Sequence, residues 1–212
     1  MKLHDPHNPT IYKYVNPIIS IMDYRTPSKL IIFGALQFGF LLFIAECLYP
    51  GYSISKNYIS DLGVGPEPSR ALFTASIIIF GACILAASYL LSKGGSDRIF
   101  SLCLALAGIG SIGVGLFNEV DYTYLHKVSA FLAFGFGGIA VLFSVRISKP
   151  PFSYISLVLG SVSLAALVLL LTKNYLGLGA GGMERMIAYP IIIWAIAFGA
   201  YLMHPGQQET LK

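Results

Sequence analysis

The sequence predicts an all-α integral membrane protein, a polytopic bundle of about six transmembrane helices. Of the 212 residues, 56% are hydrophobic and only 11% are charged, whereas about a quarter of the residues of a soluble domain are charged. The apolar residues form continuous runs close to the ~20 residues that a helix needs to cross a bilayer. These runs do not alternate as the strands of a membrane β-barrel do. Helices are therefore expected, because they satisfy their own backbone hydrogen bonds in lipid.

The runs divide the chain into a polar segment 1–28, a transmembrane domain 29–204 and a tail 205–212. The first segment is interrupted by prolines and has no early apolar core, so no cleavable signal peptide is expected. Its one apolar patch, Ile18–Met22, is predicted to lie at the membrane interface. The predicted spans are Leu30–Tyr49, Ala71–Leu91, Ile99–Phe117, His126–Val145, Phe152–Thr172 and Met186–Met203.

Basic residues predict that both termini lie in the cytoplasm, because cytoplasmic loops are enriched in Lys and Arg. The outward-facing segments are then the longer, more polar ones, 50–69, 118–125 and 173–185, and we expect function on that face of a multi-pass protein of the cell membrane. The predicted cytoplasmic basic residues are Lys2, Lys13, Arg25, Lys29, Lys93, Arg98, Arg146, Lys149 and Lys212, against Lys56, Arg70, Lys127, Lys173 and Arg185 outside.

Cysteine and glycine positions predict packing rather than chemistry. Cys47, Cys83 and Cys103 all fall inside spans and match no metal site. No metal or cofactor is expected, and scattered basic residues give no nucleic-acid surface. The third and fourth spans are rich in glycine, which allows close helix contact. These glycines are Gly108, Gly110, Gly113 and Gly115, then Gly135, Gly137 and Gly138.

The first candidate site is the hydroxyl-rich loop from Tyr49 to Gly63, which ends in Ser-Asp-Leu-Gly. Asp61 either fixes a turn by accepting hydrogen bonds from the loop's own amides or binds a lipid headgroup. Asn57, in the same loop, is a second candidate ligand for a headgroup.

The second candidate is the link between the third and fourth spans. His126 opens the fourth span after the carboxylates Glu119 and Asp121. A histidine beside carboxylates can act as a general base. The candidate catalytic residues are therefore His126, Asp61 and Glu119, although a lone histidine is more often a satisfied interfacial residue.

The third candidate is Gly181–Arg185, at the start of the last span. Glu184 is predicted in the first helical turn, where the helix dipole favours an acid. Arg185 is predicted to pair with an outer carboxylate such as Glu119 or Asp61, or to bind a phosphate. Glu46, one turn inside the first span, is a weaker candidate because it can reach the headgroups.

The motif Ile59-Ser-Asp-Leu-Gly63, together with His126 and Gly182-Met-Glu-Arg185, resembles an uncharacterised prokaryotic family of six-span membrane proteins. That family in turn looks similar to the damage-regulated autophagy modulator and GPI-remodelling-associated proteins. The resemblance implies a link to membrane lipids and assigns no catalytic residues.

Three functions remain open from the sequence. The leading hypothesis is an outer-face cluster of Asp61, Asn57, His126, Glu184 and Arg185 that binds lipid headgroups or a partner membrane protein. The second is an intramembrane lipid-modifying enzyme with His126 as base. The third is an accessory subunit of a larger membrane complex.

Overall fold

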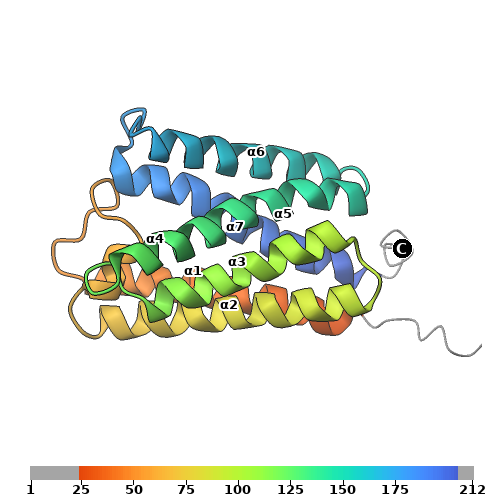
Figure 1. Cartoon of the computed structure of the whole chain (residues 1–212), viewed down its shortest axis with the longest axis horizontal. Coiled ribbons are helices and arrows are strands. Elements are labelled where there is room, and N and C mark those ends of the chain that lie inside the picture. Colours follow the sequence, from red (N-terminus) through yellow and green to blue (C-terminus); the bar gives the residue numbers. More distant parts are fainter. Residues whose placement is uncertain (1–23, 205–212) are drawn as a thin grey trace, which may run out of the picture.

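The computed structural model describes residues 24–204, which fold into helices without any strand in that range (Figure 1). Six helical segments are long and apolar enough to span a membrane, which confirms the predicted fold class. The cytoplasmic location of the termini stays a prediction. The helices are α1 (Arg25–Leu48), α2 (Ser69–Lys93), α3 (Arg98–Leu116), α4 (Thr123–Phe131), α5 (Gly137–Phe143), α6 (Phe152–Leu171) and α7 (Gly179–Met203), with short helical turns η2 (Ser60–Val64), η3 (Leu132–Phe136) and η4 (Ser144–Ile147).

The spans form a ring in which each packs against its neighbours in the sequence. α1 packs on α2, α2 on α3, and α3 on the fourth span, which consists of α4, η3, α5 and η4. α6 packs on α7, and α7 closes the ring by packing against α1 (Figure 1). α6 meets the fourth span chiefly through α5, η3 and η4 rather than through α4. One end of the fourth span is therefore free of close packing against α6.

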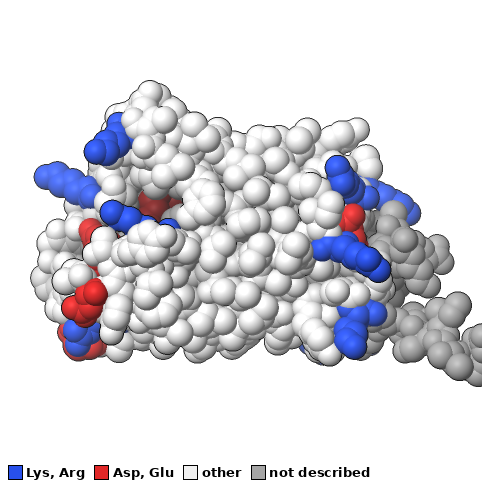
Figure 2. Space-filling view, viewed as in Figure 1, with Lys and Arg blue, Asp and Glu red and all other residues white. Residues whose placement is uncertain are grey.

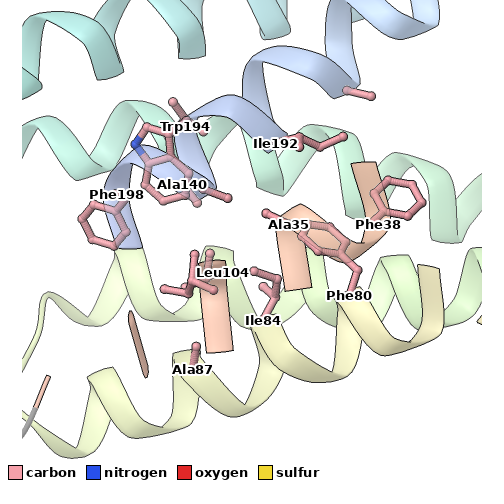
Figure 3. Close-up of a cluster of buried hydrophobic side chains, with 14 of the residues drawn as sticks. Ala35, Phe38, Phe80, Ile84, Ala87, Leu104, Ala140, Ile192, Trp194 and Phe198 are labelled. Carbon is pink, nitrogen blue, oxygen red and sulfur yellow. The ribbon is translucent and has the colours of Figure 1, made fainter. Parts of the chain in front are cut away.

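Aromatic side chains form much of the core inside the ring. Trp194 and Phe198 stack with ring centroids 4.7 Å apart, and Phe100 packs edge-on against both. Phe38 stacks on Phe80 at 5.3 Å, at the opposite side of the cluster in Figure 3. Such pairs add specific geometry to the burial of apolar area, so they fix how the first, second, third and last spans fit together.

Glycines let neighbouring helices approach to backbone contact. A Cβ atom at Gly81 would lie 2.6 Å from the carbonyl oxygen of Gly108, and one at Gly108 would lie 2.8 Å from that of Gly81. A Cβ at Gly110 would clash with the backbone nitrogen of Ala133 in η3. The predicted role of Gly108 and Gly110 in close helix contact is thereby confirmed.

The fourth span contains a π-helical turn, η3, between α4 and α5. Such turns within α-helices occur frequently at functional sites. η3 lies against α3 on one side, and its residue Phe134 lines two cavities described below.

Two helices begin earlier than their apolar runs predict. α1 begins at Arg25 rather than Leu30, and Pro27 fits its first turn, where the missing N–H leaves no hydrogen bond unmade. The first helix therefore enters the predicted polar segment 1–28. Residues 1–23, including the predicted interfacial patch Ile18–Met22, and the tail 205–212 lie outside the described residues.

α7 begins at Gly179 rather than Met186. Glu184 therefore lies in the second turn of the helix, and its predicted position in the first turn is wrong. The reason is that the loop 53–57 packs on the start of α7: the backbone N–H of Gly181 donates to the carbonyl oxygen of Ser55 at 3.0 Å. The first residues of α7 are small or polar, so hydropathy does not reveal that the helix begins there.

Charged side chains gather at the two ends of the molecule, and the band between them is uncharged in the view of Figure 2. Large apolar side chains on that band are exposed, among them Phe33, Phe40 and Val158 at 58%, 67% and 59%. Because a soluble protein rarely exposes such a continuous apolar belt, the surface fits a lipid environment. The protein is therefore an integral, multi-pass membrane protein.

Candidate functional site

The three polar segments that the sequence singles out lie together at one end of the bundle, which we call the polar end. It consists of segments 49–68, 117–122 and 172–178 and the helix ends that they join, and it lies at the left of Figure 1. Figure 2 shows a hollow at this end, with acidic side chains inside it and basic side chains near its rim. The predicted site residues at this end are Asn57, Asp61, Glu119, His126, Glu184 and Arg185.

Arg185 holds the long loop of the polar end against α1 and α7. The side chain is buried, and its Nη2 lies 2.5 Å from Glu46 Oε1 and 2.6 Å from the Tyr52 hydroxyl. Nε also donates to Glu46, at 3.2 Å. Every nitrogen of the guanidinium therefore has a partner within the chain. The backbone acceptors of Nη1, at 2.9–3.1 Å, are the carbonyl oxygens of Ile54, Asn57 and Gly181.

Arg185 pairs with a carboxylate, as predicted, but that carboxylate is Glu46 rather than Glu119 or Asp61. The ring arrangement explains the difference: α7 packs directly on α1, which carries Glu46. The Glu46 side chain is only 8% exposed and faces this cation. Since a buried ion pair requires full hydrogen bonding, the Tyr52 hydroxyl and the three carbonyl groups complete the shell.

Asp61 organises the turn in front of η2. Its Oδ2 accepts hydrogen bonds from the Asn57 side-chain amide at 2.9 Å and from the Tyr58 backbone N–H at 3.0 Å. This is the turn-fixing arrangement that the loop sequence predicts. The neighbouring Ser60 hydroxyl donates to Glu119 Oε2 at 3.1 Å, which joins the loop to the link between α3 and α4.

Glu119 has a pKa raised to about 7, chiefly because burial disfavours its charged form. Hydrogen bonding and charge repulsion from Asp61 raise this pKa further, while the Ser60 hydrogen bond opposes the rise. The carboxyl group of Glu119 therefore changes protonation near neutral pH. It lies outside the helices, in the segment between α3 and α4.

Glu184 is the most deeply placed acid of the polar end. It is 5% exposed, and its Oε2 accepts a hydrogen bond from the backbone N–H of Ile59, the residue that precedes η2. The side chain lines both cavities at this end. Glu184 thus anchors the loop with one oxygen and faces the cavities.

His126 is buried in the first turn of α4, with 7% of its surface exposed. Its Nδ1 lies 2.7 Å from the carbonyl oxygen of Phe117. A carbonyl oxygen only accepts, so Nδ1 carries the hydrogen and Nε2 of the neutral ring keeps a lone pair. Within residues 24–204 no carboxylate is hydrogen-bonded to His126, so the Phe117 carbonyl, rather than Asp61 or Glu119, orients the ring.

A cavity of about 740 Å³ opens between the fourth span and α6. We call it the lateral groove. Phe131 and Phe134 line one side and Leu167, Leu170 and Leu171 the other. We call the part lined by the buried His126 and Glu184, with Ser60 and Glu119, its inner end, and the part lined by the exposed Lys127 and Lys173 its rim.

A smaller cavity, of about 60 Å³, lies inside the ring of helices. We call it the inner chamber. It is lined mostly by apolar residues of α1, α2, α3 and α7, including Phe38, Phe73 and Ile192. The inner chamber and the lateral groove share a wall made of Ser60, His126, Ala130, Phe134 and Glu184.

The sequence missed the apolar half of this site. Phe131, Phe134, Leu167 and Leu170 look like any lipid-facing residues in a span, and no sequence signal distinguishes them. Lys173 counts in the sequence only toward the orientation of the spans. A metal site is not formed: within residues 24–204 no group of three or more His, Cys, Asp or Glu side chains has the arrangement to hold an ion.

Comparisons with known proteins identify a family. No curated protein matches the chain, and no solved structure matches it. One protein-family profile, described as protein of unknown function DUF998, matches residues 32–201, from α1 to near the end of α7. A similarity to the damage-regulated autophagy modulator or GPI-remodelling-associated proteins is not shown by these comparisons. The chain therefore belongs to the DUF998 family, a family of unknown function.

Proposed function

We propose that this protein binds a membrane phospholipid, with an acyl chain in the lateral groove and the headgroup at its polar inner end. One observation carries the proposal: a single cavity of about 740 Å³ is apolar along two membrane-spanning helices and polar where those helices end. This volume lies within the range of small-molecule sites, about 300–1,000 Å³. The two halves of the cavity match the two halves of a phospholipid.

The position of the groove favours a ligand that comes from the bilayer. The groove lies between α4 and α6, which do not pack closely together. A lipid can therefore enter sideways with its chains still in the hydrocarbon layer. A water-soluble ligand would have to pass Lys127 and Lys173 at the rim and would leave the apolar lining unfilled.

The loop motif that the sequence singles out borders the groove. The segment Ile59–Gly63 forms most of η2 and the residue that precedes it. Ser60 and the Ile59 backbone are the points where this segment reaches Glu119 and Glu184. Ser60, Glu119 and Glu184 all line the groove.

The test is to fill the groove and measure bound lipid. Ala130 lies in the wall shared by the two cavities, so Ala130→Phe should occupy the space of an acyl chain. Ala165→Phe places the same side chain on an exposed position of α6 that lines neither cavity. The protein is purified in mild detergent, and its co-purifying lipids are identified by native mass spectrometry.

We expect lipid on the wild type and on Ala165→Phe, and its loss from Ala130→Phe. The thermal unfolding curve of each variant in detergent confirms that it is folded. Equal lipid occupancy in the two variants, or a wild type that retains no lipid, would refute the proposal.

A second function, a lipid-modifying enzyme at the same site, is favoured by the state of His126. The hydrogen bond to Phe117 fixes the tautomer, so Nε2 has a free lone pair on a side chain that lines the groove. That is what a general base requires. If this function holds, the wild type converts bound lipid to a product of different mass, and His126→Gln binds the lipid without converting it. Unchanged lipid after prolonged incubation with wild type contradicts it.

A further inference from the structure

The polar inner end of the lateral groove presents hydrogen-bond acceptors rather than donors. His126 Nδ1 donates to the Phe117 carbonyl, which leaves Nε2 as an acceptor. The Ser60 hydroxyl hydrogen is directed to Glu119, so the Ser60 oxygen offers lone pairs. Glu184 uses Oε2 for the Ile59 N–H, and no partner within residues 24–204 is recorded for its Oε1.

These acceptors are buried on a cavity wall rather than spread over a surface. His126 and Glu184 are 7% and 5% exposed, and both line the lateral groove. Acceptors of two side chains that line one cavity suit a ligand that supplies several N–H donors. A positively charged donor suits them best, because Glu119 in the same lining and its neighbour Asp61 add acidic groups.

The rim of the groove has the opposite charge. Lys127, from α4, and Lys173, from the segment after α6, line the mouth on its two sides and are exposed. They lie where the apolar linings of α4 and α6 end, at the level expected for lipid phosphates. The ionisable groups of the groove thus run from cations at the rim to carboxylates inside.

We propose that the lateral groove selects phospholipids with a primary ammonium headgroup, of the phosphatidylethanolamine class. The ammonium group donates to Glu184 and His126, and the phosphate lies between Lys127 and Lys173. This inference rests on the proposed function and adds the ligand class. Phosphatidylcholine has a quaternary ammonium with no N–H to donate, and phosphatidylglycerol has a headgroup without a positive charge. Comparing these lipids therefore separates the contribution of the N–H donors from that of the positive charge.

The test is a competition between three lipids with identical acyl chains. The delipidated full-length protein in detergent receives an equimolar mixture of phosphatidylethanolamine, phosphatidylcholine and phosphatidylglycerol, and bound species are counted by native mass spectrometry. Because hydrogen bonds to charged groups are among the stronger ones, we expect about a tenfold preference for phosphatidylethanolamine over each competitor. Soluble phosphoethanolamine in excess tests whether the headgroup alone competes.

Variants then assign the preference to named residues. Glu184→Gln keeps an acceptor for the Ile59 N–H but cannot form a carboxylate that pairs with an ammonium group, and should abolish the preference while phosphatidylglycerol still binds. Lys127→Gln should weaken all three lipids alike, because each has a phosphate. Glu67→Gln is the matched control, since Glu67 is exposed at the same end and lines neither cavity.

The outcomes separate the two proposals. If the three lipids bind equally and Ala130→Phe removes all of them, the lipid site stands and the ammonium selectivity is wrong. If no lipid binds the wild type, both are wrong. A preference in the wild type that Glu184→Gln retains while folded also overturns the assignment. The wild-type competition itself does not depend on any variant folding.

Discussion

Every nitrogen of the Arg185 guanidinium donates to a partner within the chain, and the Glu46 carboxylate depends on that cation. Removing one member of a buried ion pair leaves the other charge uncompensated. We therefore expect Arg185→Ala to lower the free energy of unfolding by about 3–5 kcal/mol. Denaturant unfolding in detergent micelles measures the change. Arg185→Lys should recover little of the loss, because an ammonium lacks the planar fork of donors.

The control for this prediction is a surface pair at the same end. Arg70 and Glu67 lie 2.7 Å apart, but their side chains are 53% and 52% exposed. Exposed pairs contribute little because water screens them, so Arg70→Ala should leave the unfolding midpoint unchanged. Arg185→Ala with the midpoint of wild type would show that the buried pair does not hold the polar end together.

Glu119 makes stability depend on pH. Its pKa rises from 4.5 to about 7 on folding, chiefly through burial, so between those values the folded state holds more protons than the unfolded state. The stability from this group is therefore fully present below pH 4.5 and lost as pH rises through about 7. We expect the unfolding temperature to fall between pH 5 and 8 by a component that Glu119→Gln removes.

The comparison variant for the pH series is Asp121→Asn, an exposed position in the same segment. Its unfolding temperature should follow the wild-type slope. Glu119→Gln with the same slope as wild type would mean that another group causes the dependence.

The sequence predicts where the polar residues lie but not which side chains contact one another. The polar motifs could be placed at one end of the bundle, because alternate connections between spans must share a side. Which carboxylate pairs with Arg185 could not be predicted, since this depends on α7 packing on α1. The Phe117 carbonyl that orients His126 could not be predicted either, because its position depends on the backbone path of the segment between α3 and α4.

Among the elements, α2 and α3 come into backbone contact at Gly81 and Gly108. An added methyl at Gly81 meets backbone atoms of α3 at 2.6–2.8 Å, which cannot move without separating the helices. We expect Gly81→Ala to destabilise the bundle by about 1–3 kcal/mol, the usual range for overpacking. Thermal unfolding in detergent, followed by circular dichroism, checks this.

Gly39 in α1 offers the matched substitution. A Cβ there would meet only Ile192 Cγ2 at 3.7 Å, an ordinary contact. Gly39→Ala should therefore keep or raise stability, since Ala is favoured over Gly within a helix by up to about 1 kcal/mol. Equal losses in the two variants would argue against the backbone contact as the cause.

Hydropathy predicts the bounds of a helix well when the helix consists almost entirely of apolar residues. α2, α3 and α6 begin and end within two residues of their predicted bounds. It fails at the start of α7, where polar and small residues continue the helix under the loop. It also cannot show η3, because a π-helical turn has the same composition as the helix around it.

For the whole molecule, the two ends differ in charge. The polar end has many acids, whereas the opposite end has Asp97 as its described acid among several cations. By the positive-inside rule we expect this opposite end to be cytoplasmic. Its described cations are Arg25, Lys29, Lys93, Arg98, Arg146 and Lys149.

Thiol labelling tests this orientation. In a variant without the three native cysteines, a membrane-impermeant maleimide should label Asn174→Cys in intact cells. Lys93→Cys, at the opposite end, should be labelled only after lysis. The reverse pattern would place the polar end, and the mouth of the lateral groove, on the cytoplasmic side.

The closure of the ring between α1 and α7 has a consequence for biosynthesis. Glu46 leaves the ribosome 139 residues before Arg185, a delay on the order of ten seconds at the usual rates of translation. During that time a carboxylate that ends up buried has no cation, and the earlier spans form an incomplete ring. Until the last span arrives, Glu46 has to stay within reach of water or of another partner, because an unpaired charge inside the bilayer is costly. A nascent chain that stops before α7 lacks the Arg185 partner of this acid.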